Sequence, residues 1–171
     1  MPPTYQLVDA DTPARYQAAR ALIEEYALQI GASMGVDLYF QNLSAELDQL
    51  PVMYGPPSGF MLLAGSDEDW VGCCALRRFA DRVCEMKRLY VKSAARGAHL
   101  GRLLTEGVVN QARTLGYKRM VLDTLEDMIS ARRLYGSLGF RETTPYYRNP
   151  LAGVSYMELD LRIAQFDEHG S

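Results

Sequence analysis

The sequence predicts a mixed α/β fold of the α+β kind, in which helices flank a central mixed, mostly antiparallel sheet. Two patterns indicate it: consecutive apolar runs joined by a short turn in the first half, and β-rich runs alternating with amphipathic segments in the second. Apolar residues make up 48% of the 171 residues, enough for the core of one domain. We place this domain at residues 4–163, followed by a short tail at 164–171.

The N-terminal segment predicts a short strand and a long helix. Residues 5–9 are typical of a strand, and Thr12 followed by Pro13 is typical of a helix start, because proline is tolerated in the first turn. An apolar stripe then continues at helical spacing to Gly31, where we expect the helix to end. The stripe consists of Ala19, Leu22, Ile23, Tyr26, Ala27 and Ile30.

A loop, a short helix and a meander of strands should follow. Residues 32–42 are rich in Met, Tyr and Phe, and such a loop could lie over a binding site. A short helix over 44–50 would end at Pro51. The meander is predicted from strands at 60–64, 70–77 and 82–91, with a turn at 66–69 between the first two.

The second half predicts alternating helices and strands. The longest helix begins near Leu100, because apolar residues recur from there at helical spacing, and it ends at Gly116. A doubly wound dinucleotide-binding fold is excluded, since alternation would have to start at the N-terminus. The remaining elements are a strand at 120–123, a helix at 129–138 closed by Gly139, and strands at 140–142 and 154–161.

Charge is unevenly distributed along the chain. Residues 1–75 contain two basic and ten acidic side chains, whereas residues 76–171 contain sixteen basic and eleven acidic ones. The two halves could be ordinary solvated faces, or a basic half that holds an anion and an acidic half that meets a cation. The net charge of −3 argues against nucleic acid as a partner. No apolar run is long enough to cross a membrane and no signal peptide is evident, so we expect a cytoplasmic protein.

Three cysteines, Cys73, Cys74 and Cys84, match neither a disulfide framework nor a metal site. Only His99 and His169 could supplement them as metal ligands, so we expect no metal. We interpret the cysteines as buried, reduced thiols. The adjacent pair could instead sense oxidants, but neighbouring side chains on a strand point to opposite faces.

The segment from Leu89 to Arg102 combines a β-rich run, a turn with glycines and the start of the long helix. The first N–H groups of a helix are unpaired and lie at the positive end of its dipole, where phosphate is the usual ligand. Glycines in such a turn also occur for backbone angles alone, so the segment by itself fits a structural turn equally well.

Three motifs in order extend this interpretation: Glu85-Met-Lys-Arg-Leu-Tyr-Val91, then Arg96-Gly-Ala-His-Leu-Gly101, then Ala131-Arg-Arg-Leu-Tyr-Gly-Ser-Leu-Gly-Phe140. With them, residues 85–140 resemble the GCN5-related N-acetyltransferases (GNAT), whose order of elements agrees with almost the entire chain. The resemblance implies the GNAT fold and the use of acetyl-CoA as acetyl donor. The resemblance therefore favours phosphate binding over a purely structural role for residues 96–102.

The resemblance also assigns roles to residues. The backbone of Leu89, Tyr90 and Val91 would hold the pantetheine arm and the acetyl group, and the turn 96–102 would hold the pyrophosphate. The residues expected at the cofactor are therefore Leu89, Tyr90, Val91, Arg96, Gly97, Ala98, His99, Leu100, Gly101, Arg102, Ala131 and Tyr135.

Two positions depart from the family pattern. His99 stands where the family has its central glycine, and its Cβ restricts how closely the backbone can approach a phosphate. As a helical residue it would still present its N–H, and its imidazole is either a contact to the anion or a solvated surface group. Met128 stands where many relatives have asparagine, and we expect it in the core rather than at the cofactor.

The resemblance points to Glu85 as general base and Tyr135 as general acid. Glu85 would lie on the strand beside the acetyl group, although Lys87 should share its strand face and an ion pair would weaken the base. A water relay to Asp37 or Asp123 is an alternative. Tyr135, which would stand near the thioester sulfur, could instead be a core residue. Its hydroxyl is well suited to protonate the departing thiolate.

The acceptor is left open by the sequence. Its site, by resemblance, lies among the first helices, their loop and the segment of Tyr146, Tyr147 and Asn149. A small-molecule amine, a peptide N-terminus and a lysine side chain all fit, and the acidic N-terminal half favours a cationic amine. We also consider a homodimer. The alternative function is a non-catalytic acyl-CoA-binding sensor or interaction module on the same fold.

Overall fold

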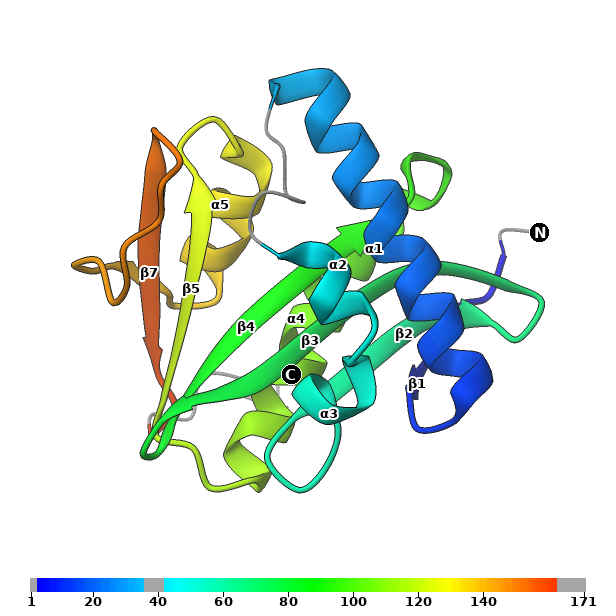
Figure 1. The fold of residues 1–171 in the computed structure, drawn as a ribbon, viewed down its shortest axis with the longest axis horizontal. Helices are drawn as coiled ribbons and strands as arrows, with labels where there is room; N and C mark the ends of the chain where they lie inside the picture. The colour runs from blue at the N-terminus through cyan, green and yellow to red at the C-terminus, as the bar shows by residue number, and fades with distance from the viewer. Residues whose placement is uncertain (1–2, 36–41, 163–171) are drawn as a thin grey trace, which may run out of the picture.

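In the computed structural model, which describes residues 3–35 and 42–162, helices lie on both faces of one seven-stranded sheet (Figure 1). The strands run in the order β1-β2-β3-β4-β5-β7-β6, and every pairing is antiparallel except β4 with β5. This confirms the predicted mixed, mostly antiparallel sheet. The strands are β1 (Gln6–Asp9), β2 (Phe60–Ser66), β3 (Asp69–Ala80), β4 (Val83–Val91), β5 (Arg119–Leu125), β6 (Arg141–Glu142) and β7 (Val154–Asp160).

The helices form two layers. One face of the sheet is covered by α1 (Pro13–Met34), α2 (Leu43–Leu47) and α3 (Leu50–Tyr54), which lie in front of it in Figure 1. The opposite face packs against α4 (Leu100–Thr114) and α5 (Ile129–Ser137), and a short 3₁₀ turn at Ser93–Ala95 precedes α4. Each layer has its own apolar core, so the sheet is buried on both faces over most of its area.

The start of α1 agrees with the sequence prediction, but its end does not. The Thr12 hydroxyl accepts a hydrogen bond from the Arg15 backbone N–H at 3.2 Å, a cap that contributes about 1 kcal/mol. The helix continues past Gly31 to Met34 and ends at Gly35, whose φ of 66° gives the left-handed ending. The prediction that the helix ends at Gly31 is wrong, because one glycine inside a helix costs only about 1 kcal/mol relative to alanine.

The predicted helix over 44–50 is also corrected. Two short helices replace it, and Pro51 lies in the first turn of α3 instead of ending a helix. Proline has no N–H to lose at a helix start, so it begins a helix as readily as it ends one. The loop predicted at 32–42 is helical up to Met34, and its residues 36–41 lie outside the described part of the chain.

The three cysteines are free and buried, as predicted. Cys73 packs into the α1 side of the sheet and Cys74 into the α4 side, which is the alternation expected on a strand. Within residues 3–35 and 42–162, no group of three or more His, Cys, Asp or Glu side chains could hold a metal ion. No helix in the same residues is both long and apolar enough to span a membrane.

Candidate active site

The site begins where the parallel strands β4 and β5 separate. β4 and β5 are paired over three residues each, Val83–Glu85 with Arg119–Val121, and then diverge (Figure 1). A cavity of about 560 Å³ opens beyond the last pair. It is lined by the later residues of both strands and by parts of α1, α4 and α5. A cavity of this size in a splayed sheet is where a small-molecule site is expected.

A bulge in β4 shapes the cavity wall. Cys73 and Ala75 of β3 are two residues apart, yet they pair with Tyr90 and Lys87, which are three apart. The extra residue is accommodated at Arg88, whose φ is 62°. A bulge leaves backbone groups without partners in the ladder, and Arg88 and the following residues line the cavity. Freed backbone N–H groups here can polarise a carbonyl group bound in the cavity.

The bulged residue, Arg88, is held in place by an ion pair with Glu46 of α2. Arg88 Nε donates to Glu46 Oε2 at 2.7 Å, and a second guanidinium nitrogen donates to Glu46 Oε1 at 3.2 Å. The Tyr54 hydroxyl also donates to Glu46 Oε1, at 2.8 Å. Burial alone would raise the pKa of Glu46, but the charge and hydrogen bonds of Arg88, with that of Tyr54, hold it below its ordinary value. The pair is therefore ionised at neutral pH.

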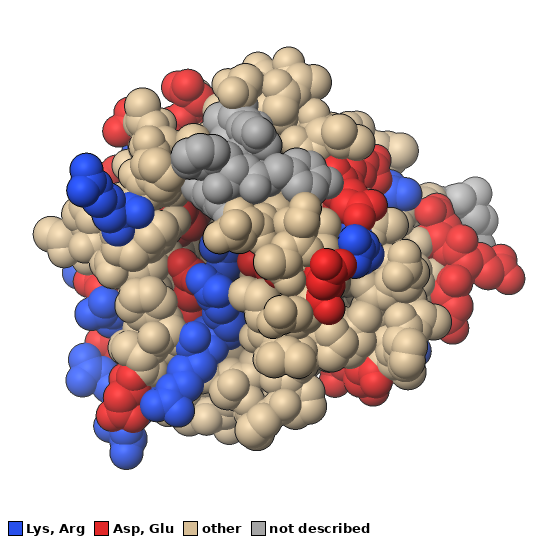
Figure 2. Space-filling model, viewed as in Figure 1, with Lys and Arg blue, Asp and Glu red and all other residues tan. Residues whose placement is uncertain are grey.

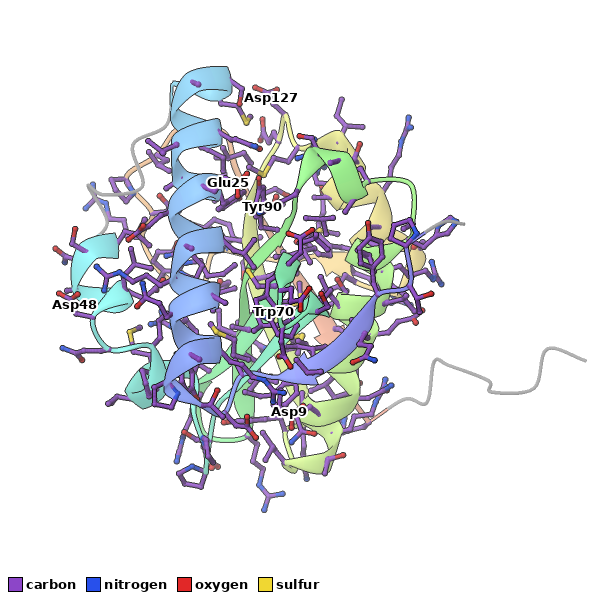
Figure 3. All side chains as sticks on the ribbon, turned by 90° about the vertical axis from the view of Figure 1, so that its right-hand side faces the viewer. Asp9, Glu25, Asp48, Trp70, Tyr90 and Asp127 are labelled. Atoms are coloured by element: carbon purple, nitrogen blue, oxygen red, sulfur yellow. The ribbon has the colours of Figure 1, made fainter. Side chains whose placement is uncertain are left out.

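The residues predicted to hold the acyl chain lie in the cavity wall. Leu89, Tyr90 and Val91 all line it. Leu89 and Val91 pack toward the α4 side of the sheet, whereas the Tyr90 ring points to α1, 5.5 Å from the ring of Tyr26. Figure 3 shows Tyr90 beside Glu25 of α1. Burial and the neighbouring Glu25 carboxylate raise the pKa of the buried Tyr90 hydroxyl.

The turn before α4 presents unpaired N–H groups. Gly97 has a φ of 96°, which favours glycine, and His99 adopts a φ of 57° directly before the helix. No side chain caps the N-terminus of α4, so its first N–H groups are open to an anion. This arrangement fits the pyrophosphate of acetyl-CoA. Arg96 and Gly101 of the turn line the cavity.

Other predicted residues of the turn lie elsewhere. Gly97, Ala98, His99 and Arg102 are exposed and outside the cavity wall, and the Leu100 side chain belongs to the core. His99 is not the helical residue that we expected. It occupies a left-handed conformation, which favours glycine, at the residue preceding the helix.

Tyr135 and Ala131 reach the cavity from α5. Both line it, together with Leu134 and Met128, so Met128 contacts the cavity as well as the core. Tyr135 is 7% exposed and its ring lies 5.6 Å from that of Phe140. Burial raises the pKa of the Tyr135 hydroxyl well above its ordinary value, so the side chain stays protonated.

Glu85 is enclosed instead of facing the cavity. It is 1% exposed and absent from the cavity wall. Its Oε1 accepts hydrogen bonds from Arg77 at 2.9 Å, and its Oε2 accepts one from the Tyr146 hydroxyl at 2.6 Å. The ion pair expected with Lys87 is corrected, because Arg77 lies directly opposite Glu85 in the neighbouring strand.

Asp123 is the carboxylate of β5 that lines the cavity. Its Oδ2 accepts hydrogen bonds from the Tyr147 hydroxyl and, at 2.9 Å, from the Asn149 side-chain amide. The segment that the resemblance placed at the acceptor is thus fastened to the sheet by Asp123 and Glu85. Asp37, the other carboxylate considered, lies outside the described residues.

Sequence reasoning missed three contributors to the site: the Arg88–Glu46 pair, the Arg77–Glu85 pair and the position of Lys87 in the cavity wall. A signal was present. Residues 85–88 read Glu-Met-Lys-Arg inside a strand that is otherwise apolar, and charged residues in a central strand need partners or a functional reason. The partners were not identifiable, because Glu46 is distant in the sequence.

A splayed sheet with a bulge, a helix N-terminus open to phosphate and, between them, a cavity lined by apolar and charged side chains are the features of an acyl-CoA-dependent acyltransferase. Comparison with known proteins agrees. The model of the acetyltransferase (GNAT) family matches residues 18–140. A Schizosaccharomyces pombe protein named as an uncharacterised N-acetyltransferase is 44% identical over 144 residues, covering 83% of this chain and 86% of that one. The chain belongs to the GNAT family.

Solved structures of acetyltransferases share the fold of this chain. A GNAT acetyltransferase from Staphylococcus aureus superposes with a TM-score of 0.76 at 18% identity, covering 92% of this chain and 99% of that one. An acetyltransferase from Salmonella typhimurium, solved with acetyl-CoA, superposes with a TM-score of 0.63 at 22% identity, covering 98% of this chain and 96% of that one. The protein is an acetyl-CoA-dependent acyltransferase.

Proposed function

We propose that the protein transfers the acetyl group of acetyl-CoA to a primary amine of a small molecule or peptide, by direct attack in a ternary complex. One observation carries the proposal: a single continuous cavity is lined by the bulged strand and Tyr135 on the donor side and by Asp123 on the other. A relay through a cysteine is not needed, and Cys73, Cys74 and Cys84 are all buried outside the cavity wall.

Direct attack requires a proton acceptor. An alkylamine with a pKa of about 10.4 is only ~0.04% neutral at pH 7, which corresponds to ~4.6 kcal/mol. We assign the role of general base to Asp123, because it lines the cavity. Asp123 takes the proton from the amine directly or through a water molecule. Glu85 contacts the acceptor side only through the Tyr146 hydroxyl. We therefore assign to Glu85, the base expected from the sequence, the positioning of Tyr146.

The remaining roles follow from placement. Backbone N–H groups at the Arg88 bulge polarise the thioester carbonyl as the amine nitrogen attacks its carbon. The C–S bond then breaks, and the Tyr135 hydroxyl donates its proton to the sulfur, on which negative charge develops. The raised pKa of Tyr135 keeps this proton in place, and the same apolar surroundings also penalise a free thiolate.

Thermal shift and thiol release test the proposal together. Acetyl-CoA should raise the unfolding temperature, since a ligand that binds only the native state stabilises it by mass action. Thiol release from acetyl-CoA should increase with some members of a panel of amines, amino acids and short peptides. Binding of acetyl-CoA without faster thiol release by any amine would contradict the proposed transfer.

A further inference from the structure

The charges in the cavity wall are not all neutralised within the protein. Among the described residues, the basic side chains that line the cavity are those of Lys87, Arg88 and Arg96, and the acidic ones are those of Asp123 and Asp127. Arg88 forms an ion pair with Glu46. Arg96 lies at the turn before α4, and its Nε donates a hydrogen bond to the Val91 carbonyl oxygen. Lys87 makes no ion pair or hydrogen bond with any described residue.

Lys87 lies on the acceptor side of the bulge. It precedes Arg88 in β4 and also lines a second cavity of about 260 Å³, together with Arg77 and Arg88. Figure 2 shows a strip of Lys and Arg on this face, over β3 and β4. Burial lowers the pKa of Lys87, although the charges of Glu85 and Asp123 act in the opposite direction. An ammonium group taken out of water gains most from a bound anion.

The acidic N-terminal half contributes no charged side chain to the described part of the cavity wall. The described residues that α1 contributes to its wall are Tyr26, Gln29, Ile30, Ser33 and Met34, none of which is charged at neutral pH. The expectation of a cationic acceptor from overall charge therefore finds no support in the described wall. The ammonium group on β4 and the carboxylate on β5 together suit a molecule that carries both charges.

We propose that the acceptor carries a carboxylate beside its amine, as a free amino acid does, with Lys87 binding the carboxylate and Asp123 receiving the amine. This inference rests on the proposed function and specifies its substrate class. A lysine side chain in a protein and an amine without an acid group lack the partner for Lys87. Lys87 is accordingly a specificity-determining residue.

The test compares each standard amino acid with its own amide, which keeps the shape and removes the negative charge. The amine of an amide is less basic, so a slower reaction cannot come from a shortage of neutral amine. Because a hydrogen bond to a charged group is one of the stronger single polar contacts, the preferred amino acid should exceed its amide about 10- to 150-fold in kcat/KM. The same ratio is expected in Lys118→Met, which removes an exposed lysine outside the cavity wall.

Lys87→Met should lower the ratio to one or below, since the amide has the larger fraction of neutral amine, and Lys87→Arg, which restores the charge, should recover most of the preference. Binding of the amino acid in the presence of unreactive CoA, measured by calorimetry, gives a readout independent of turnover and should show the same dependence on Lys87. Bound CoA with no measurable amino-acid binding overturns the inference, as do amides that react as well as amino acids, or a ratio unchanged in Lys87→Met. Failure of acetyl-CoA itself to bind would instead overturn the proposed function.

Discussion

Arg88 and Glu46 form a buried, two-point ion pair that joins the bulge of β4 to α2. Arg88 is the residue that takes up the extra length of its strand, with a φ of 62°, and its guanidinium is enclosed between Glu46 and the Tyr54 hydroxyl network. A helix that does not line the main cavity thereby fixes the backbone to which we assign polarisation of the thioester. The fold of the α2–α3 segment and the chemistry of the donor site are linked through these two side chains.

Removing the carboxylate of this pair should be costly. Glu46→Gln keeps the size of the side chain but leaves the Arg88 charge buried without a partner, so we expect a loss of about 3 kcal/mol in the free energy of unfolding. Urea denaturation measures it. Asp48→Asn is the matched control, because Asp48 pairs with Arg20 at the surface and should cost less than about 0.5 kcal/mol. Equal losses in the two variants would contradict the assignment.

The same pair predicts the acid sensitivity of the fold. The pKa of Glu46 is lower in the folded protein than its ordinary value of 4.5, because Arg88 outweighs the effect of burial. The stabilisation is therefore complete above about pH 4.5 and is lost as the pH falls through the lowered folded value. The difference in unfolding free energy between wild type and Glu46→Gln should shrink on going from pH 7 to about pH 3. A constant difference would exclude Glu46 as the group responsible.

Local pattern was sufficient for most of the sheet and for the turn before α4. This turn was identifiable from Arg96, Gly97 and Gly101, because a turn and the start of a helix depend on a contiguous segment. The acceptor side was not. The family resemblance pointed to Glu85 as the base, but Arg77 and Tyr146 enclose it from parts of the chain that no local pattern connects. Which of two carboxylates faces a cavity is decided by packing across strands.

His99 offers a direct test of backbone strain at the cofactor turn. It holds a left-handed conformation that costs an L-residue about 1–2 kcal/mol and glycine almost nothing. His99→Gly should raise the unfolding free energy by about 1 kcal/mol and leave acetyl-CoA binding as tight or tighter. His99→Ala, which keeps the strain, should bind like wild type. Weaker binding in both variants would show that the imidazole contacts the phosphate.

Substitutions of Asp123 and of Glu85 should affect different kinetic constants. Loss of a general base lowers turnover by about 10²-fold or more, so Asp123→Asn should reduce kcat strongly with saturating acceptor. Glu85→Gln should mainly raise the KM for the acceptor, because it loosens the Tyr146 segment without removing a group from the cavity wall. Steady-state kinetics with both substrates varied distinguishes these effects. The reverse pattern would return the role of base to Glu85.

Tyr135 should be needed for turnover and not for binding. Tyr135 lies in the cavity wall, and the raised pKa of its hydroxyl keeps the proton in place throughout the physiological range. Tyr135→Phe keeps the packing against Phe140, so we expect kcat to fall by about 10²-fold while the Kd for acetyl-CoA changes less than about twofold. Tyr5→Phe, which alters a ring packed against the same core from outside the cavity wall, is the control for the loss of a hydroxyl. Unchanged kcat in Tyr135→Phe, measured with the preferred acceptor, would remove this hydroxyl from the mechanism and leave protonation of the sulfur to water.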